Sequence, residues 1–202
     1  MNAIARAMCP PTLLISCLIL PLAGSAQATP GLPRVKITTE LGAFVVVVDT
    51  VRAPVTGKNF LRYVDGGFYD GGVFHRTVTP DNQPNDSIRI AVVQANIDRE
   101  RRGETLGSIP LERTSLTGLR HLDGTISMAR SGPGTAVASF FICVGDQPEL
   151  DFGGRRNPDG QGFAAFGQVT EGMDVVRQIN VSVAEGQSLT PPIGIIRVER
   201  LE

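Results

Sequence analysis

The chain has 202 residues, of which 19 are Lys or Arg and 20 are Asp or Glu, so its formal net charge at pH 7 is −1. A nearly neutral chain without a basic run does not match the phosphate backbone of nucleic acid, and we expect no nucleic-acid partner. The two histidines and three cysteines show no metal-ligand spacing, so we expect neither a metal nor another cofactor.

The first 28 residues have the pattern of a secretory signal peptide. A short apolar core, TLLISCLILPLAG at 12–24, is followed by AQA at 26–28, which supplies small residues for cleavage. The core is shorter than the roughly 20 apolar residues that a transmembrane helix needs. We therefore expect a signal peptide at 1–28 and one domain at 29–202. An uncleaved membrane anchor and a lipoprotein, with its lipid on Cys17, are the alternatives.

Cleavage would remove Cys9 and Cys17 and leave Cys143 without a disulfide partner. Cys143 lies between Ile142 and Val144, a setting typical of a buried apolar residue. A secreted chain without disulfides suggests the periplasm of a Gram-negative bacterium. After signal cleavage we expect a monomer with no membrane partner.

The residues that follow predict a mainly β fold. Residues 35–40 alternate apolar and polar side chains, as in a half-buried strand, and 43–49 form a more buried partner. Pro54 suits the first turn of a helix that Gly66-Gly67 would end. Many short strands with Gly- and Pro-rich links favour a closed barrel or a sandwich, with helices over its open ends. Further strands are expected at 73–76, 88–95, 124–130, 139–144, 163–169 and 194–201, and a second helix at about 172–180.

Three polar stretches are expected to be loops. They cover 79–87, 98–105 and 151–162, and the last carries turn signals at Asn157-Pro158 and Asp159-Gly160. This last stretch lacks the acidic spacing and closing Glu of a calcium-binding loop.

Five motifs, in order, resemble those of the cyclophilins, which are peptidyl-prolyl cis-trans isomerases. The resemblance runs from about residue 34 to residue 201 and implies an eight-stranded antiparallel β-barrel capped by two α-helices. The motifs are VKITTELGAFVVVVD, NFLRYVDGGFYDGGVFHR, GTISMARSGPGT, SFFICVGDQPELD and FAAFGQVTEGMDVVRQI.

The resemblance implies rotation about X-Pro peptide bonds. Resonance gives the amide C–N bond partial double-bond character and a barrier of about 18–20 kcal/mol. A cation near the prolyl nitrogen stabilises the twisted amide, in which that nitrogen gains a lone pair, and an apolar floor holds the proline ring. By resemblance, Arg76 matches the catalytic arginine, Phe141 the aromatic floor, and Gln94 the glutamine that holds the substrate backbone.

Substrate binding is assigned by the same resemblance. Val92 and Leu150 match apolar walls of the proline pocket, and Ser139 stands where the family has a glutamine. Ala129 and Arg130 match residues whose main chain pairs with the peptide before the proline. The expected partners are Pro-containing segments of unfolded or exported proteins.

Several positions depart from the family pattern. Ala91 stands where an aromatic is expected, Glu149 replaces a tryptophan, and a pocket histidine aligns near Gly153-Gly154. Each change opens the pocket or removes a polar contact. The alternative to an isomerase is therefore a cyclophilin-fold module that binds Pro-containing peptides without accelerating rotation, and a weaker alternative is a structural role in an envelope assembly. His75 and His121 are expected to be structural, because the reaction transfers no proton.

Overall fold

The structure is a computed structural model, and it describes residues 31–202. The predicted signal peptide, with Cys17 and the cleavage site, lies outside these residues. Within them no helix is long and apolar enough to cross a membrane.

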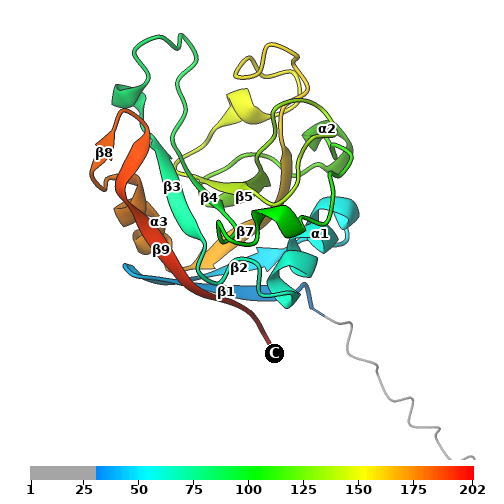
Figure 1. The fold of residues 1–202 in the computed structure, drawn as a ribbon. Coiled ribbons are helices and arrows are strands. Elements are labelled where there is room, and N and C mark those ends of the chain that lie inside the picture. The colour runs from blue at the N-terminus through cyan, green and yellow to red at the C-terminus, as the bar shows by residue number, and fades with distance from the viewer. Residues whose placement is uncertain (1–30) are drawn as a thin grey trace, which may run out of the picture. The chain divides into compact units, whose positions relative to one another are not determined.

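Strands of the described part form one antiparallel sheet that closes on itself (Figure 1). The order is β1-β2-β7-β5-β6-β4-β3-β9, and β1 also pairs with β9, which closes an eight-stranded barrel. β8 pairs only with β9 and lies outside this ring. The strands are β1 (Arg34–Thr39), β2 (Gly42–Val48), β3 (Val73–Val78), β4 (Val92–Asn96), β5 (Thr125–Met128), β6 (Phe140–Cys143), β7 (Ala164–Glu171), β8 (Ala184–Glu185) and β9 (Ser188–Leu201).

The two predicted helices are present and pack on the barrel. α1 (Pro54–Asp65) begins with its proline and ends at Gly66. Its Phe60 is fully buried, with its ring centroid 5.6 Å from that of Phe140 and 5.1 Å from that of Phe166. α3 (Met173–Asn180) buries Val176 and Ile179 and contacts β2, β3 and β4. The barrel core is therefore sealed by aromatic and branched side chains from both helices.

Short helical turns lie in the connections, and the sequence did not predict them. α2 (Thr114–Thr117) is one turn long and ends at Gly118, whose φ of 70° favours glycine. Three 3₁₀ turns, η1 (Pro80–Asn82), η2 (Arg102–Glu104) and η3 (Pro148–Leu150), lie in or beside the expected polar loops. Segments this short carry too little apolar periodicity to detect.

The prediction of a strand over 88–95 is wrong for its first half. β4 begins only at Val92, because the buried side chain of Gln83 takes both backbone groups of Ile90. Its Nε2 donates to the Ile90 carbonyl at 2.7 Å, and its Oε1 accepts from the Ile90 N–H at 3.2 Å. Ile90 therefore belongs to the β3–β4 connection, the 79–91 loop.

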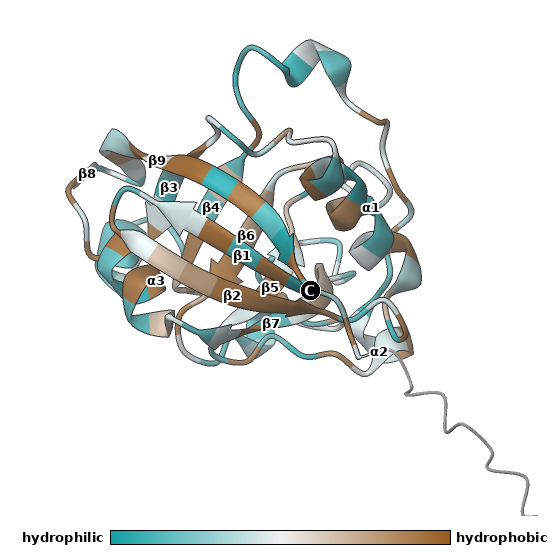
Figure 2. Ribbon diagram, turned by 90° about the horizontal axis from the view of Figure 1, so that it is seen from below, coloured by the Kyte–Doolittle hydropathy of each residue, from teal (hydrophilic) through white to brown (hydrophobic). Residues whose placement is uncertain are grey.

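The last strand is longer than predicted. β9 starts at Ser188 rather than near 194. Pro191 and Pro192 lie within it, although neither has a backbone N–H to donate to a neighbouring strand. Both prolines are exposed, a position where a strand tolerates the missing N–H. Figure 2 shows brown apolar and teal polar residues alternating along β9, as expected for a strand with one face on the core.

Candidate functional site

Arg76 lies on β3 just after an irregularity in the strand. It pairs with Gln94 of β4 and with Ser188 of β9, and both registers shift between Phe74 and Arg76. His75 is thus the extra residue of a β-bulge, a feature that redirects the side chains around it. Phe74 is buried in the barrel core, whereas Arg76 lines a pocket outside that core.

Two glutamines hold the guanidinium of Arg76. Its Nη1 donates to Gln94 Oε1 at 3.0 Å, while Nε and Nη2 donate to Gln187 Oε1 at 2.9 and 2.6 Å. Gln94 Nε2 in turn donates to Ser139 Oγ at 3.1 Å. Burial, followed by the positive charge of Arg156, lowers the pKa of Arg76 from its usual value. Because no carboxylate pairs with it among the described residues, the cation is positioned but not neutralised.

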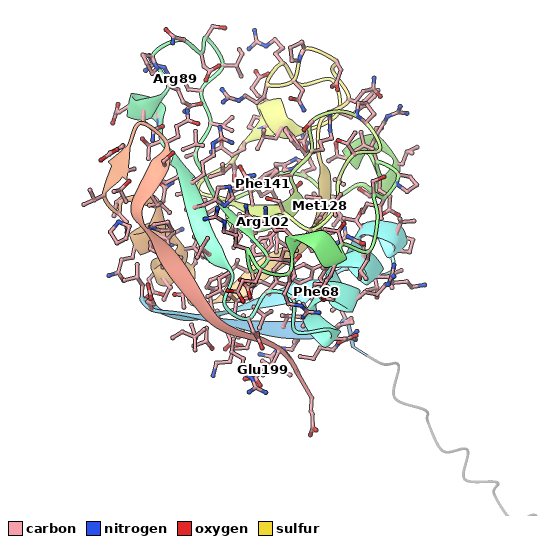
Figure 3. The ribbon with its side chains drawn as sticks, in the orientation of Figure 1. Phe68, Arg89, Arg102, Met128, Phe141 and Glu199 are labelled. Atoms are coloured by element: carbon pink, nitrogen blue, oxygen red, sulfur yellow. The ribbon has the colours of Figure 1, made fainter. Side chains whose placement is uncertain are left out.

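A pocket of about 270 Å³ with an apolar floor adjoins this arginine. Its floor belongs to a second hydrophobic cluster, separate from the barrel core, in which Val92, Phe141 and Leu150 are at most 5% exposed. In Figure 3, Phe141 lies near the centre, below the loops at the top of the view. Arg89, at the upper left, lies in the 79–91 loop. The pocket is lined by Arg76, Ile90, Val92, Gln94, Ala129, Arg130, Phe141, Leu150, Arg156, Asn157 and Phe163.

The two adjacent phenylalanines of β6 lie on opposite faces of the sheet, because successive side chains of a strand alternate. Phe140 belongs to the barrel core, and Phe141 belongs to the cluster beneath the pocket. Cys143, two residues along, lies in the same cluster as Phe141 and is fully buried. Burial raises the pKa of its thiol, so the prediction of an unreactive Cys143 agrees with its surroundings.

His121 supports the floor from behind. Its ring stacks on Phe141 at a centroid distance of 6.0 Å and an interplanar angle of 15°. Nδ1 lies 2.7 Å from Asp151 Oδ1, and Nε2 lies 2.9 Å from Ser127 Oγ. His121 is 1% exposed, so no substrate reaches it, and its contacts are those of the structural histidine that the sequence predicted.

The structure brings together the predicted site residues with one exception. Ser139 lines a neighbouring hollow rather than the pocket itself, and its hydroxyl donates to the Ala95 carbonyl at 2.8 Å. The Ala129 N–H donates to the Ser139 carbonyl at 2.9 Å, so that group is occupied. The Arg130 N–H makes no hydrogen bond within residues 31–202. The residues that do line one pocket are Arg76, Gln94, Phe141, Val92, Leu150, Ala129 and Arg130.

Where the sequence departs from the family pattern, neighbouring residues line the pocket instead. Ala91 does not line the pocket, but Ile90 does. Gly153 and Gly154, near which the family's pocket histidine aligns, do not line it either. The wall belongs to Phe163, whose ring meets that of Phe141 edge-on at 5.2 Å.

Glu149, at the position of the expected tryptophan, points to another partner. Its carboxylate binds Arg155 at 2.7 Å, and this hydrogen bond lowers the pKa of Glu149. Glu149 does not line the pocket, so the indole that the family supplies has no counterpart there.

Three further residues at the site, Gln187, Arg156 and Asn157, were not predicted from the sequence. Gln187 lies in the two-residue turn between β8 and β9, where Gly186 has a φ of 61°. The only signal was Glu-Gly-Gln-Ser, a glycine-initiated hairpin turn. Arg156 and Asn157 lie in the 151–162 loop, and nothing in a turn-rich stretch indicates which side chains face a pocket.

A closed eight-stranded antiparallel barrel that carries an arginine beside an aromatic-floored pocket is the arrangement expected of a cyclophilin-type prolyl isomerase. Residues 34–200 match the family model described as cyclophilin type peptidyl-prolyl cis-trans isomerase/CLD. The chain belongs to this family and is a peptidyl-prolyl cis-trans isomerase.

Similar proteins support this assignment. Peptidyl-prolyl cis-trans isomerase A of Dickeya dadantii is 36% identical over 148 residues, covering 73% of this chain and 70% of that protein. Isomerase B of Escherichia coli is 34% identical over 151 residues, covering 74% and 85%. A crystal structure of a Cryptosporidium parvum cyclophilin type isomerase has a TM-score of 0.67 at 19% identity, covering 84% of this chain and 98% of that one. A second structure of that isomerase, in the presence of the dipeptide Ala-Pro, has a TM-score of 0.66.

Proposed function

We propose that Arg76 catalyses rotation of X-Pro bonds in the pocket floored by Phe141. The observation that carries this is the guanidinium at the pocket wall, fixed by Gln94 at 3.0 Å and by Gln187. An N–H of Arg76 directed at the prolyl nitrogen stabilises the lone pair that exists only in the twisted amide, which lowers the barrier rather than tightening ground-state binding.

The other lining residues hold the substrate. Phe141, Val92 and Leu150 grip the proline ring, while Gln94 orients Arg76 and offers its remaining lone pair and N–H to the peptide backbone. The free Arg130 N–H is available to the peptide before the proline. Ser139 acts indirectly, by holding Gln94. The Ala-Pro dipeptide named for the Cryptosporidium structure is the simplest ligand of this type.

We further propose that the enzyme acts on exported proteins in the bacterial periplasm. The support is the signal-peptide pattern at 1–28 together with a folding-assistance chemistry that needs no cofactor or nucleotide. The substrates would be Pro-containing segments of chains that have crossed the inner membrane, and the mature domain would act as a monomer.

An isomerisation assay on a short blocked Ala-Pro peptide tests the catalytic proposal. Magnetisation-exchange NMR measures the cis-trans rate directly, and catalysis should be lost on substitution of Arg76. The rival is a binding module without catalysis, favoured by the absence of tryptophan from the chain and by the engagement of both ends of the Gln94 amide. Peptide binding with an unchanged exchange rate would establish the rival.

A further inference from the structure

Two donor side chains of the 151–162 loop line the pocket without a role in the chemistry above. Arg156 donates from Nη1 to the Ile88 carbonyl at 2.6 Å, and Nη1 lies 3.1 Å from Asp86 Oδ2. Its side chain is 14% exposed. These contacts anchor the guanidinium between the two loops, at the end of the pocket formed by Ile90.

Both residues keep donors that the protein does not use. Nε and Nη2 of Arg156 make no hydrogen bond within residues 31–202. Asn157 Nδ2 is buried and has no acceptor there. A buried donor without an acceptor costs about 1–3 kcal/mol, so a pocket that retains one is suited to a ligand that brings an acceptor.

The charge of the pocket favours an anionic acceptor. Arg76, Arg130 and Arg156 line it, and no acidic side chain of the described residues does. Arg130 is committed to Asp159 at 2.8 Å and to the Gly162 carbonyl. Within residues 31–202, Arg76 is bound only by neutral glutamines. In the described part of the chain, Arg156 pairs with Asp86 through Nη1 alone, so its Nε and Nη2 stay available for a carboxylate, and Arg76 adds an unpaired positive charge to the same pocket.

The position of Arg156 indicates which part of a peptide it meets. Ile90, Val92 and Gln94 line the pocket in series, and Arg156 binds Ile88 beyond the Ile90 end. Gln94 and Arg130 lie at the other end, where the pocket meets the neighbouring hollow. If the peptide before the proline pairs with Arg130, the residue after the proline leaves towards Arg156.

We propose that Arg156 and Asn157 form a subsite for the carboxylate of an acidic residue directly after the proline. The inference rests on the proposed function for the direction of the peptide. Arginine binds a carboxylate through parallel N–H groups, and Nε and Nη2 form such a pair. The favoured substrate class is then X-Pro-Asp and X-Pro-Glu segments.

The test compares three blocked peptides, Ala-Ala-Pro-Glu-Phe, Ala-Ala-Pro-Ala-Phe and Ala-Ala-Pro-Lys-Phe. Exchange NMR is the assay, because it does not depend on a protease that reads the residue after proline. We expect kcat/KM to be about tenfold higher for Glu than for Ala and lowest for Lys, mainly through KM. The preference should shrink at ~1 M NaCl, where the Debye length falls to about 3 Å.

The readout for variants is the Glu-to-Ala ratio of kcat/KM within each protein, after circular dichroism has shown that the variant is folded. Arg156→Gln should bring the ratio close to one, and Arg156→Lys should retain part of it. Asp86→Asn should raise the ratio, because it removes the carboxylate that competes for Arg156. Arg155→Gln is the matched control, because the Arg155 side chain is 72% exposed and binds Glu149. The wild-type ratio should therefore persist in this variant.

The outcomes separate this subsite from the isomerase proposal. Equal rates on the three peptides, or a ratio that survives Arg156→Gln, would overturn the subsite and leave the isomerase intact. If no peptide were isomerised, the catalytic proposal would fail, and the affinities of the same three peptides would still decide the subsite.

Discussion

At the scale of single residues, the site depends on one cation held in a defined orientation. Arg76 is half-buried and contributes three N–H groups to two glutamines. An unrestrained arginine would lose side-chain entropy at each encounter with substrate. In this protein that ordering is completed on folding, so the guanidinium is already in place when a peptide binds.

Arg76→Ala should lower kcat/KM by about 100-fold or more, the loss expected when a preorganised donor is removed from a developing charge. Arg76→Lys should recover only part of the rate, because an ammonium cannot reproduce the planar fork held by two glutamines. Exchange NMR on an Ala-Pro peptide measures the rate, and circular dichroism confirms the barrel. A folded Arg76→Ala protein with the wild-type rate would refute the assignment.

Gln187→Met should lower kcat by about tenfold with little change in KM, since a hydrogen bond to a charged group is worth about 1.5–3 kcal/mol. Methionine keeps the size of glutamine but lacks its acceptor oxygen. Gln187→Glu keeps an acceptor and should rescue most of kcat. The backbone bond from the Thr77 N–H to the Gln187 carbonyl remains in both variants.

Gln178 supplies a control for this prediction, because it is exposed on α3 and its side chain makes no hydrogen bond within the described residues. Gln178→Met should leave kcat and KM unchanged. If Gln187→Met instead raised KM and spared kcat, Gln187 would be a substrate contact and not a positioning residue.

The contrast between Arg76 and Gln187 shows what the sequence can predict at this scale. Arg76 was identifiable because it lies in a motif whose neighbours share its strand. Gln187 comes from a turn 111 residues away, and only the closure of β3 onto β9 brings it to the arginine. Contacts between remote elements depend on register, which local patterns do not determine.

At the scale of elements, the loops around the pocket deviate most from the sequence prediction. Periodicity located the strands of the barrel because each has one face in the core. It failed over 88–91, where Gln83 replaces a neighbouring strand as the hydrogen-bond partner of Ile90. A side chain that substitutes for a strand leaves no periodic signal.

Asp151 connects the 114–122 region to the pocket floor and should make stability depend on pH. Burial alone would raise its pKa, but hydrogen bonds from the His121 side chain and N–H outweigh this effect and lower it. A pKa that is lower in the folded state contributes stability above the unfolded value. That stability is lost as pH falls through the folded pKa.

Asp151→Asn should therefore lower the free energy of unfolding at pH 7 by about 1–3 kcal/mol and flatten its decline in acid. Urea denaturation at pH 7 and at about pH 3 would measure both effects. Asp81→Asn, at an exposed residue whose carboxylate accepts no hydrogen bond in the described region, should leave the acid profile unchanged. A parallel loss at both pH values in Asp151→Asn would show that packing, and not ionisation, is responsible.

At the scale of the whole molecule, closure of the sheet creates the site. β1 pairs with both β2 and β9, so the ring has no free edge apart from the short β8 extension. The interior is filled by the barrel core, and the pocket lies on a separate outer cluster. The proline ring can therefore be bound without disturbing the packing that keeps the barrel stable.

The fold class was predictable because its motifs span the chain. The pocket walls from Phe163 and Arg156 were not predictable, because these residues come from an irregular loop.

The signal-peptide pattern at 1–28 should direct the chain out of the cytoplasm. Expressed with its own first 28 residues in a Gram-negative host, the protein should be recovered from the periplasm with Thr29 as its first residue. The physical basis is the apolar core at 12–24, too short to span a bilayer comfortably, followed by the small residues Ala26 and Ala28. Intact mass measurement decides the cleavage site, and fractionation decides the compartment.

Replacement of both Ala26 and Ala28 by Leu should block cleavage and leave the precursor at the membrane, because the peptidase requires small residues at these two positions. Cys17→Ser is the control for lipidation. It should change nothing if the signal peptide is cleaved after Ala28, since Cys17 would be discarded. A wild-type mass that includes a lipid, lost in Cys17→Ser, would place the enzyme on a membrane as a lipoprotein. An unprocessed N-terminus in the wild type would leave the periplasmic proposal without support, while the isomerase assignment, which rests on residues 34–200, would stand.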